Sequence, residues 1–125
     1  MLERRAKIRS FTDLTVWQEG HKLVLMVYRE TKNFPDKEAF GLTSQLRRAV
    51  VSITSNIAEG FSRSSYSDKA NFYSIARGSL TEVQNQLVIA RDVGYLPKDA
   101  FSQLAIQAVV VHKLLNAFIR KTRES

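Results

Sequence analysis

Hydrophobic positions recur every three or four residues in four long stretches of this chain, which is the spacing of one face of an α-helix. In the last stretch they are Phe101, Leu104, Ala108, Val111, Leu115 and Phe118. In the third they are Tyr73, Ala76, Leu80, Val83, Leu87 and Ala90, and in the second Leu46, Ala49, Val50, Ile53 and Ile57. In the first they are Leu14, Trp17, His21, Val24 and Tyr28. No stretch alternates as a β-strand does, so the pattern predicts four helices.

Polar residues, glycines and prolines between these stretches predict where the helices begin and end. We expect helices over about 14–32, 43–59, 67–93 and 98–121. Thr12 or Asp13 offers a cap for the first helix, and Ser67 offers one for the third. Gly60 and Gly94 follow the second and third helices, where a glycine commonly terminates a helix. Pro97 suits the first turn of the fourth helix.

Alternating steps of three and four residues are typical of helices that pack at about 20° to one another. Short connections make consecutive helices antiparallel. The sequence therefore predicts an all-α fold, an antiparallel up-down-up-down left-handed four-helix bundle over 11–122. A basic N-terminal extension, 1–10, precedes it.

Three of the predicted helices carry more apolar residues than a lone bundle can bury. Beside the stripes above, the extra positions are Val16, Leu23, Val27, Phe72, Ile75, Ile89, Val93, Ile106, Val110, Leu114 and Ala117. Large exposed apolar surfaces usually mark association sites. We therefore predict a homo-oligomer with an interface at Phe72, Ile75, Ile106, Val110 and Leu114. The alternative is that loops or the N-terminal segment cover these positions.

The net charge of +7 lies mostly at the two ends of the chain. Basic ends attract nucleic-acid phosphates in a salt-dependent manner, although they also serve as solubilising tails. The candidate contacts to RNA or DNA are Arg4, Arg5, Lys7, Arg9, Arg47, Arg48, Arg63, Arg120, Lys121 and Arg123. The sequence shows no aromatic platform for base stacking among them.

Two short motifs carry a second set of polar residues, SNIAEG at 55–60 and ARGSLTE at 76–82. Antiparallel packing brings the second and third helices together, so these residues could form one hydrogen-bonded cluster with Arg63. The candidate members are Asn56, Glu59, Gly60, Arg77, Gly78, Ser79 and Glu82. Such a cluster would either fix helix ends and register or recognise a partner.

Residues for catalysis or metal binding do not form a recognisable motif. The chain has no cysteine, and neither His21 nor His112 follows a glutamate by three residues as in di-iron bundles. We expect no enzyme activity, no cofactor and no metal site. Neither a signal-peptide core nor a membrane-length apolar run is evident, so we expect a cytoplasmic protein without a membrane partner.

The two motifs, together with DLTVWQEGHKLVLMVY at 13–28 and the segments 34–60 and 72–87, resemble a known family. This family comprises the four-helix bundle proteins encoded in intervening sequences of bacterial 23S rRNA genes. The resemblance implies a four-helix bundle that commonly forms a homopentamer. A related branch, the accessory variability determinant of diversity-generating retroelements, is a basic pentamer that binds a reverse transcriptase and nucleic acid.

These observations predict a non-enzymatic, oligomeric bundle that binds RNA or DNA weakly through its basic surfaces. The alternative is a protein-interaction scaffold, for example for a reverse transcriptase, with no direct role in nucleic-acid binding.

Overall fold

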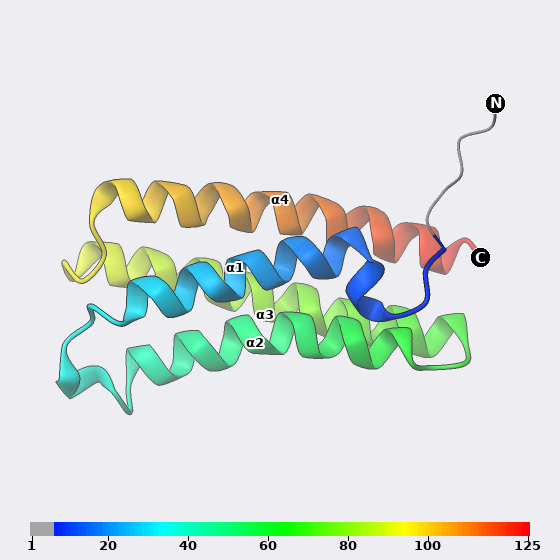
Figure 1. Ribbon diagram of the computed structural model, residues 1–125, viewed down its shortest axis with the longest axis horizontal. Helices are drawn as coiled ribbons and strands as arrows, with labels where there is room; N and C mark the ends of the chain where they lie inside the picture. Colours follow the sequence, from blue (N-terminus) through cyan, green and yellow to red (C-terminus); the bar gives the residue numbers. More distant parts are fainter. Residues whose placement is uncertain (1–6) are drawn as a thin grey trace.

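Four helices account for most of the chain in a computed structural model, which describes residues 7–125 (Figure 1). They are α1 (Thr15–Thr31), α2 (Leu42–Phe61), α3 (Tyr66–Asp92) and α4 (Lys98–Arg123). Two single turns of 3₁₀ helix, η1 (Phe11–Asp13) and η2 (Asp36–Glu38), precede α1 and α2. Consecutive helices run in opposite directions, and the described residues contain no strand. The predicted all-α antiparallel bundle is therefore confirmed.

The helix starts differ from the predicted caps by a few residues. Ser10 accepts a hydrogen bond from the Thr12 N–H, and the Asp13 carboxylate accepts one from the Ser10 N–H, so these residues form η1. α1 begins only at Thr15, and the prediction that Thr12 or Asp13 caps it was wrong. Ser65, rather than Ser67, caps α3 by accepting the Asp68 N–H at 3.1 Å. Capping geometry is a local competition among neighbouring serines that the sequence leaves open.

The two glycines expected to end helices behave differently. Gly94 has a φ of 88° and terminates α3 as predicted, with the Tyr95 N–H bonded to the Ala90 carbonyl. Gly60 is helical, and α2 continues through it to Phe61. The role of Gly60 as the terminating residue was therefore a wrong prediction. Lys69 instead satisfies the end of α2, because its ammonium donates to the Phe61 carbonyl at 2.8 Å.

The core faces of α2, α3 and α4 match the sequence pattern, but that of α1 does not. The buried residues of α1 are Val16, Gly20, Leu23, Val27 and Thr31. The expected stripe is only partly buried, and Tyr28 is exposed. Gly20 explains the difference, because a Cβ there would lie 3.2 Å from Thr54 Cγ2, so α1 approaches α2 closely on that face.

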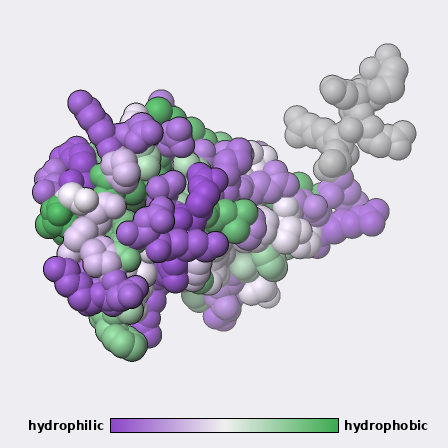
Figure 2. All heavy atoms as spheres, turned by 60° about the vertical axis from the view of Figure 1, so that its left-hand side comes forward, coloured by the Kyte–Doolittle hydropathy of each residue, from purple (hydrophilic) through white to green (hydrophobic). Residues whose placement is uncertain are grey.

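Apolar side chains remain on the outer faces of the bundle. Ile75 is 53% exposed and Ile106 is 63% exposed, as the interface prediction requires. Leu114 is a correction, because it is partly buried and packs against the core. It shares a hollow with Ile8 and Leu14, so the N-terminal segment covers part of α4. Phe72 is also only partly exposed. In Figure 2, hydrophobic and hydrophilic side chains are interspersed over the surface that comes forward.

The connections at one end of the bundle are held together by a carboxylate. Glu38 accepts hydrogen bonds from the Tyr95 hydroxyl at 2.8 Å and from the Leu42 N–H at 3.0 Å. The hydrogen bond from the Leu42 N–H lowers the pKa of Glu38 most, and the bond from the Tyr95 hydroxyl lowers it further. The hydrogen bond to Glu38 in turn raises the pKa of Tyr95. The lowered pKa means that Glu38 contributes stability above its ordinary pKa and loses it as the pH falls through the folded value.

Candidate nucleic-acid interface

Most of the predicted phosphate contacts lie at one end of the bundle. α1 and α3 begin there, and α2 and α4 end there (Figure 1). The bundle thus gathers the basic residues that precede η1, that follow α2 and that end α4. They are Lys7, Arg9, Arg63, Arg120, Lys121 and Arg123. All six are exposed. Arg4 and Arg5 lie outside the described residues.

A hollow between α3 and α4 at this end is lined by three arginines. We call it the basic hollow; its volume is about 510 Å³, and it is lined by Arg77, Asn116, Ile119, Arg120, Arg123 and Glu124. The Arg77 guanidinium donates to Asn116 Oδ1 at 3.0 Å, and that of Arg123 donates to Ser74 Oγ at 3.2 Å. Neutral partners thus hold two guanidinium groups in place without cancelling their charge.

Sequence reasoning placed Arg77 in the polar cluster and missed its position beside Arg120 and Arg123. The signal was present in the chain. Counting equal steps back along α3 and forward along α4 from their connection brings Arg77 level with Lys113, about one turn before Asn116. Antiparallel register, rather than a motif, was therefore the information that would have found the basic hollow.

Arg47 and Arg48 do not join this site, because they lie near the start of α2 at the opposite end. Arg47 is partly buried, its Nε donates to Thr31 Oγ1 at 2.8 Å, and its guanidinium stacks 4.6 Å from the centroid of the Tyr28 ring. The Arg47 side chain therefore makes a packing contact between α2 and α1. Arg48 is exposed beside it.

The predicted polar cluster is divided into three separate groups, and Glu82 stands apart from all three. The Arg63 guanidinium pairs with Glu59 at 2.9 Å and lies 4.6 Å from the centroid of the Phe72 ring. Arg77 belongs to the basic hollow. Glu82 is exposed on α3 and has no hydrogen bond or ion pair within the described chain. The single hydrogen-bonded cluster was therefore a wrong prediction, since helix rotation points its members in different directions.

The third group is a hydrogen-bonded contact between α2 and α3. Ser52 Oγ and Ser79 Oγ lie 2.8 Å apart, and the Asn56 amide donates to the Ser52 carbonyl and hydroxyl at 2.8 and 3.0 Å. Ser79 is buried. These three residues fix the register of the two helices and offer little access to a ligand.

α4 also meets the length and composition criteria for a membrane-spanning helix. This is weak evidence, because core helices of soluble proteins meet the same criteria. In the bundle, one face of α4 is buried through Leu104, Ala108, Val111 and Leu115. The absence of a membrane partner stays a prediction.

The fold and the basic end define the protein as a helical bundle with a charged surface site. The family model described as "23S rRNA-intervening sequence protein" matches residues 12–117, and the chain belongs to this family. No curated protein matches the chain. Among solved structures, the chain resembles a crystal structure of a protein with unknown function from the S23 ribosomal protein family of Bacteroides thetaiotaomicron. The TM-score is 0.76 at 21% identity, and the alignment covers 84% of this chain and 98% of the other. This likeness supports the fold.

Proposed function

We propose that this protein is a non-enzymatic, self-associating bundle of the cytoplasm that binds RNA or DNA through the basic hollow and the neighbouring basic residues. The observation that carries the proposal is the hollow itself. Arg77, Arg120 and Arg123 surround an open space that contains one carboxylate, Glu124. Guanidinium groups match phosphate oxygens in charge and geometry.

Self-association supports this function, because several copies multiply weak single-chain contacts into avidity. The exposed apolar side chains of Ile75, Ile106 and Val110 support an assembly of several copies. A closed ring, such as the pentamer that the family resemblance implies, would present one basic end from each copy on the same side.

A matched pair of charge variants tests the nucleic-acid proposal. The first replaces Arg77, Arg120 and Arg123 with glutamine, and the control replaces Arg29, Lys32 and Lys37, which are exposed at the opposite end. Filter binding to single-stranded RNA and DNA across about 50–300 mM salt measures both affinity and its salt dependence. We expect at least about a tenfold loss of affinity and a shallower salt slope for the first variant alone. Equal losses in both variants, or an affinity that salt leaves unchanged, would contradict the proposal.

A second candidate is a scaffold that binds a polypeptide, such as a reverse transcriptase, without contacting nucleic acid. The exposed apolar side chains of Ile106, Val109 and Val110 on α4 favour it, because such a surface suits side chains better than phosphates. A pull-down from lysate distinguishes the two functions. Recovery of a protein partner that persists after nuclease treatment, combined with no binding to purified RNA or DNA, would favour the scaffold.

A further inference from the structure

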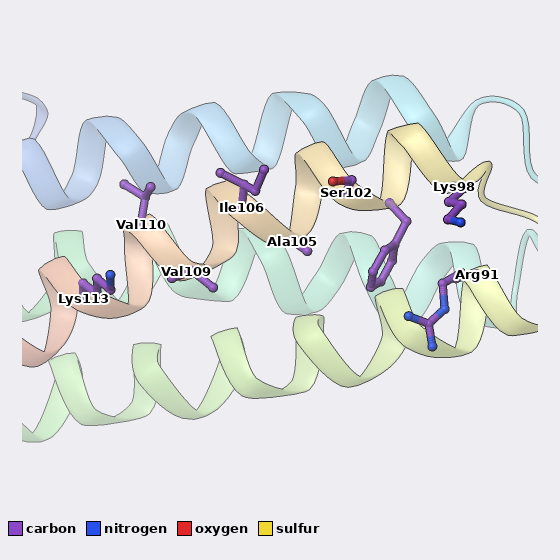
Figure 3. Close-up of a pocket in the computed structure, with 9 residues that line it drawn as sticks. Arg91, Lys98, Ser102, Ala105, Ile106, Val109, Val110 and Lys113 are labelled. Carbon is purple, nitrogen blue, oxygen red and sulfur yellow. The ribbon is translucent and has the colours of Figure 1, made fainter.

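An apolar groove follows the outer face of α4, beside the last turns of α3 (Figure 3). We call it the α4 groove; its volume is about 650 Å³. Phe101, Ala105, Ile106, Val109 and Val110 supply its apolar lining. Ile106 is 63% exposed and Val109 is 45% exposed. A groove of this size and composition can accept large apolar side chains.

Phe40, in the connection between α1 and α2, is the most exposed large apolar side chain among the described residues, at 98%. Its backbone is well fixed. The Gly41 N–H donates to the Glu38 carbonyl at 2.9 Å, and the Ala39 N–H donates to the Asp36 carbonyl at 3.0 Å. The Glu38 carboxylate ties this turn to Tyr95 and Leu42. Phe40 is therefore presented on a rigid turn, which lowers the entropic cost of binding.

Phe40 and the Phe101 end of the α4 groove lie near the same end of the bundle axis but on different sides of the bundle. The α1–α2 and α3–α4 connections share one end (Figure 1), and the Phe101 end of the groove is next to the second of them. The groove, however, belongs to α3 and α4, whereas Phe40 adjoins α1 and α2. The surface beside Phe40 is also partly apolar, with Tyr28 and Val51 each 38% exposed in a cleft that Ala39 borders. A parallel second copy placed alongside would bring the two surfaces together.

The charges of the turn that carries Phe40 favour this arrangement. The charged residues that line the α4 groove, Arg91, Lys98 and Lys113, are all basic. The turn before Phe40 carries Asp36 and Glu38, with Lys37 between them, whereas Arg47 and Arg48 line the adjoining cleft that holds Tyr28 and Val51. Two α4 grooves placed face to face would instead bring lysines and arginines together, and such like-charge contacts are unfavourable.

We propose that Phe40 of one copy inserts into the α4 groove of the next, in a head-to-tail contact between parallel bundles. The inference rests on the proposed self-association and names the surfaces that produce it. A buried phenylalanine covers about 150–250 Å², whereas a stable interface needs about 1,200–2,000 Å². Phe40 is thus the anchor of a larger contact, to which the turn Asp36–Glu38 contributes. Because the two surfaces differ, each copy offers one anchor and one groove, and the contact repeats.

Sedimentation velocity on three variants tests the contact. Phe40→Ser removes the anchor, Ile106→Asp blocks the groove, and Tyr66→Ser is the control, an exposed aromatic residue at the other end. We expect wild type and Tyr66→Ser to assemble, and Phe40→Ser and Ile106→Asp to sediment as 14.2 kDa chains. Circular dichroism checks that each variant is helical. Mixing the two defective variants should restore dimers, because one keeps its groove and the other keeps its anchor.

The outcomes separate this inference from the proposed self-association. An assembled wild type with an equally assembled Phe40→Ser variant would overturn the inference alone. A monomeric wild type would overturn both the self-association and the Phe40 contact. This holds even if the α4 groove of that monomer binds a different polypeptide or a lipid vesicle.

Cysteine cross-linking gives an independent test, since the chain has no cysteine of its own. Ala39 adjoins the anchor and Ser102 lines the groove, and both are exposed. We expect mild oxidation of the Ala39→Cys/Ser102→Cys double variant to produce a ladder of linked chains. The control pair, Ala39→Cys with Ser67→Cys at the other end, should produce none. A double variant that assembles normally and forms no ladder would overturn the proposal.

Discussion

The motifs at 55–60 on α2 and 76–82 on α3 have similar compositions but different surroundings. Gly60 is buried against α3, where a Cβ would lie 2.6 Å from Tyr73 Cε1 and 3.0 Å from Phe72 Cβ. Gly78 is exposed and has nothing within 4 Å of its Cβ position. In each motif one side forms the α2–α3 contact and the other faces solvent. The comparison shows that the same residue type is required for packing in one motif and not in the other.

Replacing Gly60 with alanine should have the largest effect on stability. Alanine favours the helix by about 1 kcal/mol relative to glycine, but its methyl group would overlap the Tyr73 ring. Overpacking typically costs about 1–3 kcal/mol, and both neighbours are parts of α3 rather than flexible chain ends. We expect a net loss of up to about 2 kcal/mol in the free energy of unfolding, measured with urea.

A second measurement on Gly60→Ala identifies the cause. Burial raises the pKa of Tyr73 to about 12. If the methyl group displaces the ring toward solvent, the pKa of Tyr73 should fall toward its ordinary value in an ultraviolet titration of the tyrosines. In wild type, the raised pKa means that stability from Tyr73 is complete below the ordinary tyrosine value and is lost as the pH rises through the folded value. An unchanged titration together with unchanged stability would contradict the close contact.

Gln86 extends the comparison along the face of α3 that carries Ser79. It is 5% exposed, and its Oε1 has no hydrogen-bond partner among the described residues. A buried, unpaired polar group costs about 1–3 kcal/mol. Gln86→Met removes that cost at similar volume, and we expect the free energy of unfolding to rise by about 1 kcal/mol or more. Gln103→Met, at an exposed position, is the control and should change it by less than about 0.5 kcal/mol.

Ser79 represents the opposite case, because its hydroxyl is paired. Ser79→Ala removes the 2.8 Å contact with Ser52, and we expect a loss of about 1 kcal/mol in urea unfolding. Ser67→Ala, at an exposed position, should leave stability nearly unchanged. A Ser79→Ala variant as stable as wild type would show that the hydroxyl pair makes no net contribution to the α2–α3 contact.

The smallest expected effect belongs to Gly78→Ala. The added methyl group meets no neighbour, so helix propensity alone should raise stability by about 0.5–1 kcal/mol. The opposite signs expected for Gly60→Ala and Gly78→Ala make thermal or urea unfolding of the two variants a direct test of the comparison. A destabilised Gly78→Ala that sediments as a smaller species would instead place Gly78 in a contact between copies.

Much of the fold was predictable, because helical periodicity and helix-terminating residues are local signals. The core stripes of α2, α3 and α4 and the turn at Gly94 agree with the structure. The core face of α1 was wrong because its two apolar lines are similarly hydrophobic, and only the close approach at Gly20 decides between them. The candidate site was less predictable, since Arg77 meets Arg120 and Arg123 only through the register of α3 against α4.

The sequence by itself determined that the chain forms helices, where most of them begin and end, and that its ends are basic, because each of these properties depends on neighbouring residues. Only the tertiary structure decided which apolar line of α1 is buried, which of the two glycines is packed, and which arginines share a hollow. Those outcomes depend on the rotation and register of whole helices, which are set by contacts between residues far apart in the chain.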